Sequence, residues 1–120
     1  MKYANEIGYS DVRPYEVVKV ISDKTIEVRA MNAELDPNWK PEFVSGGFSG
    51  HCVNQSSQKW IITSDLEAPV FRIRYSKRHS YVERIGHNNW EPTEVRCFAD
   101  AGGNRYKLSD EPRKFYDYNF

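Results

Sequence analysis

The sequence predicts a mainly β fold, α+β at most: a bent antiparallel sheet or small barrel of six to seven short strands, with one long loop and a short C-terminal helical turn. Apolar and polar residues alternate over short stretches, turn residues separate these stretches at close spacing, and aromatic residues make up 14% of the composition. The 120 residues match the usual size of one domain, which we place at residues 1–120.

The clearest predicted element is a hairpin near the start of the chain. Residues 15–21 are rich in β-branched side chains, and residues 22–24 read Ser-Asp-Lys, which favours a turn. Residues 25–31 then alternate, which places Ile26 and Val28 together on one face. We therefore expect two antiparallel strands joined by a tight turn.

Residues 32–58 are predicted to form the long loop, because they contain two prolines, three glycines and little periodicity. The glycine-rich stretch within it, "GGFSG", lacks the spacing and the Gly-Lys-Ser/Thr ending of a phosphate-binding P-loop. We interpret residues 46–60, which end in the Trp60 strand, as a wall or lid over a nucleotide pocket. The alternative is an excursion packed down by Trp39, Phe43 and Phe48.

The second half of the chain predicts further short strands separated by turns. They are expected at residues 59–63, 70–76, 81–85, 93–99 and 106–108. The helical turn is expected in "SDEPRKF", where Ser109 or Asp110 could cap it and Pro112 falls in its first turn.

Arg72 and Arg74 are the first candidate binding residues. Their period-two spacing places both on one face of the expected strand, about 7 Å apart, which suits the two phosphates of a diphosphate. The alternative interpretation, an ordinary solvated face, is the more common use of such a pattern.

The stretch "HNNWEP" supplies the second group of candidates. Its amides could bond a base edge or a ribose hydroxyl, and its Trp could stack on a base. A turn with the Trp in the core is the alternative. The full set of expected ligand-binding residues is Arg72, Arg74, Asn88, Asn89, Trp90, Trp60, Tyr81 and Arg96.

Several other classes of function are disfavoured. Lys and Arg balance Asp and Glu at 17 each, so we expect no binding of duplex nucleic acid. No apolar run approaches the roughly 20 residues of a membrane span, so we expect no membrane. Two cysteines and three scattered histidines predict no metal site, and we expect no cofactor and no catalytic residues.

Three stretches of the chain together carry a resemblance: "GYSDVRPYEVVKV", "NAELDPNWKPEFVSGGFSGHC" and "RKFYDYNF". They resemble a family of small proteins from phages and prophages, some of which look like the first type of anti-Thoeris sponges. The resemblance implies capture of a cyclic ADP-ribose isomer without cleavage, and hence inhibition of Thoeris immunity. It also implies a homo-oligomer, cyclic oligonucleotides as possible further ligands, and the cytoplasm of an infected or lysogenic bacterium as location.

Two other hypotheses remain open from the residues. One is an enzyme that degrades a cyclic nucleotide, with a base and acid such as His51 and Glu42 or Asp36. The other is a phage interaction or structural module without a small ligand, in which the aromatic C-terminus "FYDYNF" makes the contact. That C-terminus is also the expected segment for self-association.

Overall fold

The predicted fold class is confirmed: in the computed structural model, the chain is mainly β and antiparallel. The structure describes residues 2–46, 49–83 and 93–118. Within them one 3₁₀ turn, Gln55–Ser57, accompanies the strands. The strands are β1 (Tyr3–Ile7), β2 (Val12–Arg13), β3 (Tyr15–Ser22), β4 (Thr25–Leu35), β5 (Phe43–Gly46), β6 (Ser49–Cys52), β7 (Trp60–Ser64), β8 (Val70–Tyr75), β9 (Tyr81–Glu83), β10 (Thr93–Val95), β11 (Cys97–Ala99) and β12 (Arg105–Ser109).

Six of these strands close into a barrel. The hydrogen-bonded order runs β1, β3, β4, β8, β11 and β12, and β12 pairs again with β1. The expected hairpin is confirmed as β3 and β4, with Asp23 and Lys24 at its turn. Closure removes the free edges that an open sheet would present. Strands β2 and β7 are additions to this ring, on β1 and β4.

The barrel interior holds the main hydrophobic core. Tyr15 packs edge-on against two of the core rings, with centroid separations of 5.8 Å to Phe71 and 5.2 Å to Tyr106. The predicted alternation is confirmed on residues 25–31 and 71–75, because Ile26, Val28 and Ile73 are buried and the charged residues between the inward positions face outward. The fully buried members of the core are Ala4, Ile26, Val28, Ile73, Phe98 and Tyr106.

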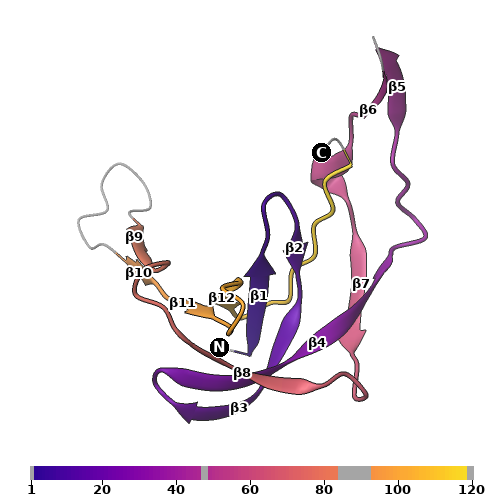
Figure 1. Ribbon diagram of the computed structural model, residues 1–120. Helices are drawn as coiled ribbons and strands as arrows, with labels where there is room; N and C mark the ends of the chain where they lie inside the picture. The colour runs from indigo at the N-terminus through magenta and orange to yellow at the C-terminus, as the bar shows by residue number, and fades with distance from the viewer. Residues whose placement is uncertain (1, 47–48, 84–92, 119–120) are drawn as a thin grey trace.

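A second region, which we call the arm, extends from the barrel (Figure 1). It consists of residues 31–64 and the tail 115–118. The far half of β4 pairs with β7 in the register from Met31–Ser64 to Leu35–Trp60. The hairpin of β5 and β6 continues the arm, and the hairpin of β9 and β10 leaves the barrel on the other side (Figure 1).

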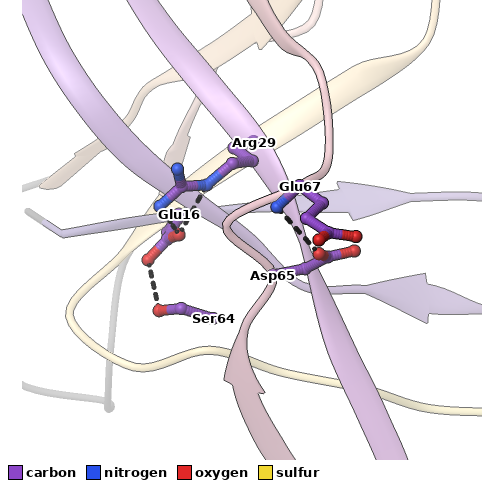
Figure 2. A network of polar contacts seen from close by, with 5 residues as sticks. All are labelled: Glu16, Arg29, Ser64, Asp65 and Glu67. Carbon is purple, nitrogen blue, oxygen red and sulfur yellow. Dashed lines mark hydrogen bonds and ion pairs between the residues drawn. The ribbon is translucent and has the colours of Figure 1, made fainter.

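Glu16 connects the barrel to the arm. One carboxylate oxygen of Glu16 accepts hydrogen bonds from Arg29 Nε at 2.9 Å and Nη2 at 2.5 Å, and the other accepts from Ser64 Oγ at 2.8 Å. Figure 2 shows this network beside the β7–β8 turn, where Asp65 accepts a bond from the backbone N–H of Glu67. Strands β3, β4 and β7 thus meet at one carboxylate.

The expected long loop is wrong in two places. Strand β4 continues to Leu35, and the stretch also contains the β5–β6 hairpin. This hairpin is held by backbone hydrogen bonds between β5 and β6. Such bonds do not require alternating apolar side chains, so the glycine-rich sequence showed no strand pattern. Of the residues named in the packed-down alternative, Trp39 fits, since it is 8% exposed and its ring lies 5.8 Å from that of Tyr118. Phe43 is 57% exposed, and Phe48 lies outside the described residues.

The expected C-terminal helical turn is also wrong. Residues 110–115 contain bends at Asp110 and Glu111 and no helical turn, because long-range partners take several of their backbone groups. The Asn5 side chain donates to the Glu111 carbonyl at 3.2 Å and accepts from the Arg113 N–H at 2.9 Å. Phe115 then bridges to Val12 through two backbone bonds of 3.0 Å. These bonds outweigh the local capping signals of the sequence.

Candidate anion-binding site

The outer surface of β8 carries the expected arginine pair. Arg72 and Arg74 are exposed, on the side opposite the core residue Ile73. Arg72 Nε lies 3.5 Å from Glu27 on the neighbouring strand, so part of its charge is balanced. Arg74 has no ion-pair partner within the described residues. Of the two, Arg74 is therefore the better placed to bind an anion.

A second pair of cations lies two strands away, on β12. Arg105 and Lys107 alternate with the inward-facing Tyr106, as Arg72 and Arg74 do around Ile73. The register places Arg74 opposite Ala99, and Ala99 opposite Arg105. Directly opposed residues point to the same face, so both pairs lie on one outer surface, about 10 Å apart across two strand spacings.

We call this surface the basic face, defined by Arg72, Arg74, Arg105, Lys107 and Arg113. It contains two clefts. The one around Arg72 and Arg74 has a volume of about 500 Å³ and also includes Ser76 and Asp100. The other has about 220 Å³ and is lined by Ile7, His79, Tyr81, Cys97, Arg105, Lys107 and Arg113.

The second cleft, which we call the basic cleft, brings together three cations, an imidazole and a phenol without a carboxylate in its lining. Within the described part of the chain, none of the three cations forms an ion pair. Like charges gathered in this way repel one another unless an anion joins them. The arrangement therefore favours a ligand that carries more than one negative charge.

Two hydrogen-bonded segments position the walls of the basic cleft. On one side, Ser80 Oγ accepts from the Cys97 N–H at 2.9 Å and donates to the Ser76 carbonyl at 2.8 Å, which fixes the turn that carries His79. On the other side, buried Asn5 holds the backbone of Arg113. The cations thus project from ordered backbone.

The thiol and carboxylate nearest the site have shifted pKa values. Burial raises the pKa of Cys97, although Arg105 and Lys107 oppose the shift through their positive charge. For Asp100, burial is outweighed by hydrogen bonds from Asn104, Tyr106 and Gly102, so its pKa is lowered. Asp100 is therefore ionised at neutral pH, and its oxygens are occupied by hydrogen bonds within the protein. The Cys97 thiol stays protonated at neutral pH.

The predicted site residues do not converge. Arg72 and Arg74 lie on the basic face, and Tyr81 lines the basic cleft. Arg96 lies instead at one mouth of the barrel, where it donates to the Asp23 carbonyl. Trp60 lies on the arm under Lys114, whose Nζ is 5.4 Å from the ring centroid.

The remaining predicted residues, Asn88, Asn89 and Trp90, lie outside the described residues. The expected lid is also not seen at the basic face. The described residues of 46–60 belong to the arm (Figure 1), and none of them lines either cleft.

Sequence reasoning missed Arg105, Lys107 and Arg113. The first two carry the period-two signal that identified Arg72 and Arg74, in the stretch "RYKL", so they could have been found. Arg113 carries no such signal, because its place is set by long-range bonds of the C-terminal segment to Asn5 and Val12.

No protein-family model, no curated protein and no solved structure matches this chain. In the part of the chain that the structure describes, no group of three or more His, Cys, Asp or Glu side chains is arranged to hold a metal ion. Among the same residues, no helix is long and apolar enough to cross a membrane. A function is therefore argued from the geometry of the basic face.

Proposed function

We propose that this protein binds a small phosphorylated molecule of the nucleotide class and holds it without breaking a bond. The observation that carries the proposal is the gathering of five cations on one outer surface of a chain whose net charge is zero. Two carboxylates lie beside these cations: Glu27 pairs with Arg72, and Asp100 accepts bonds from its own turn. Arg74, Arg105, Lys107 and Arg113 form no ion pair within the described residues.

The spacing of the cations suits a diphosphate. Arg105 and Lys107 are about 7 Å apart along their strand, which lets each bind one phosphate of a pair. Tyr81 lies in the same cleft and is 48% exposed, so its ring offers a face on which a base can stack. A cyclic ADP-ribose isomer has this combination of adenine, riboses and diphosphate.

The wider biological role follows from the sequence resemblance. We propose that the ligand is a cyclic ADP-ribose isomer, and that a phage or prophage product holding it would keep the signal from a Thoeris sensor. A homo-oligomer and the host cytoplasm remain part of this proposal. The described tail residues 115–118 pack against their own chain. Self-association through the tail would therefore use its exposed side chains, such as Tyr116.

One observation favours a second candidate, a hydrolase. Ser76 Oγ and His79 Nδ1 lie 2.8 Å apart beside the two clefts, the distance of a nucleophile and its base. The described residues place no carboxylate on His79 to orient it, and the contact also fits a local turn between residues three apart. Reversible binding is therefore the function that the geometry supports better.

A heat-release assay tests the proposal. The protein is incubated with a cyclic ADP-ribose isomer, separated from free ligand, denatured by heat, and the supernatant is analysed by mass spectrometry. We expect the intact molecule to reappear in full, with Ser76→Ala behaving like the wild type. Recovery of a hydrolysed product that Ser76→Ala abolishes would establish the hydrolase. No retained ligand, with all of the ligand intact in the unbound fraction, would overturn both candidates.

A further inference from the structure

The mouth of the barrel beside the β3–β4 turn contains a cavity that the basic face does not include. Its volume is about 210 Å³. The cavity opens on the inner side of the strands, whereas Arg74 and Arg105 point outward, so the two sites are separate. It is lined by Val17, Val20, Ser22, Asp23, Ile26, Arg96, Phe98 and Leu108.

The wall of this cavity is apolar and fixed. Ile26 and Phe98 belong to the buried core, at 4% and 1% exposure, and Val17 and Leu108 pack against it. Val20 lies at the rim and is 66% exposed, which is high for an apolar side chain on a strand of the barrel. A ligand in the mouth would cover this surface without displacing the core.

Asp23 and Arg96 are the two charged residues of the lining, and the cation is Arg96. Its Nη2 donates to the Asp23 carbonyl at 2.6 Å, and its guanidinium lies 4.9 Å from the Tyr75 ring and 5.7 Å from the Phe98 ring. A guanidinium has five N–H groups, and Arg96 forms no ion pair within the described residues. The remaining N–H groups of Arg96 can bind an anion whose apolar body lies in the cavity, on the side of the rim away from the Asp23 carboxylate.

We propose that this mouth binds a small monocarboxylate with one ring or a branched apolar body, independently of the basic face. The body would lie against Phe98 and Ile26, and the carboxylate would accept hydrogen bonds from Arg96. The size agrees, because an apolar cavity of about 150 Å³ is known to hold benzene. The remaining volume accommodates a carboxylate. A diphosphate would find only one cation here and no second partner.

Benzoate is the probe for a titration followed by amide NMR. We expect shifts concentrated at Ile26, Phe98 and Leu108, and an affinity at least about tenfold above that of benzyl alcohol, because a charge-assisted bond is lost in the alcohol. Equal affinities for acid and alcohol, or shifts confined to Arg105 and Lys107, would overturn the proposal. So would the absence of shifts at these residues at millimolar benzoate.

A matched pair of variants at Val20 keeps Arg96 and the core intact. Val20→Asp places a negative charge at the rim and is expected to weaken benzoate binding at least about tenfold, while Val20→Asn, equal in size but neutral, should weaken it much less. Arg105→Gln with Lys107→Gln should leave benzoate binding unchanged. A loss equal in both Val20 variants, or a loss in the Arg105 and Lys107 variant, would contradict the proposed site.

Discussion

The barrel and the arm are held together by different interactions. The barrel closes on six buried apolar or aromatic side chains. The arm has Trp39 and Cys52 buried, and depends on side-chain amides that bond to backbone. The Gln58 side chain illustrates this: it accepts hydrogen bonds from Trp60 Nε1 at 2.6 Å and the Tyr116 N–H at 2.8 Å, and it donates one to the Tyr116 carbonyl at 2.9 Å.

The difference explains where a binding site can be built. Apolar burial fixes the register of β8, β11 and β12. The spacing of the cations on the outer side of these strands is therefore set by the sheet and does not depend on ion pairs. The arm lacks a comparable buried core and leaves Phe43, Val44 and Ile61 exposed. Its candidate ligand group, Trp60, is engaged by Gln58 and Lys114. The barrel therefore offers the preorganised surface.

The largest effect is expected from Phe98→Ala in the barrel core. Phe98 is 1% exposed, and truncating such a side chain costs about 3–5 kcal/mol. Urea denaturation gives the change in the free energy of unfolding. Ile61→Ala on the arm, at 48% exposure, is the control and should change it by less than about 1 kcal/mol. Comparable losses in the two variants would refute the contrast between the regions.

A smaller effect is expected from Glu16→Ala at the junction. The change leaves the half-buried guanidinium of Arg29 without its partner and should cost about 1–3 kcal/mol. Hydrogen exchange should rise in β7 while β11 and β12 stay protected. Glu27→Gln, at the more exposed pair with Arg72, is the control and should change little. Equal deprotection of the whole barrel would show that the arm is not a separate region.

The smallest effect on stability is expected from Asp100→Asn, at about 1 kcal/mol near neutral pH. The pKa of Asp100 is lowered by folding, so its contribution is present above the unfolded pKa of about 3.9 and is lost as pH falls through the folded value. The stability difference between wild type and variant should therefore shrink below about pH 4. A difference that stays constant down to pH 2 would contradict this assignment.

The sequence predicts the barrel better than the arm, for a physical reason. Alternation on residues 25–31 and 70–76 reports burial on one face, and both strands were predicted. Strand β1 was not predicted, because Asn5 and Glu6 break its alternating pattern. Asn5 is buried on the outer side under the C-terminal segment, and a carboxylate oxygen of Glu6 lies 3.3 Å from the Tyr106 hydroxyl. Partners about 100 residues away leave no local signal.

The same limit applies to the site. The pairing of Arg74 with Arg105 depends on Ala99 lying between them, and this register is a property of the closed sheet. Arg96 was predicted to share a ligand site with Arg72 and Arg74, but its contacts place it over Tyr75 and Phe98 at the barrel mouth. Spacing along one strand is readable from sequence, whereas neighbours across strands are not.

The most direct test of the basic face is calorimetric titration of a cyclic ADP-ribose isomer into wild type and Arg105→Gln/Lys107→Gln. We expect at least about a 100-fold loss of affinity from two charge-assisted bonds, with an unchanged melting temperature because both side chains point outward. Lys19→Gln/Lys24→Gln removes the same charge from the β3–β4 hairpin and should bind like wild type. Unchanged affinity in the first variant, or an equal loss in the second, would contradict the account.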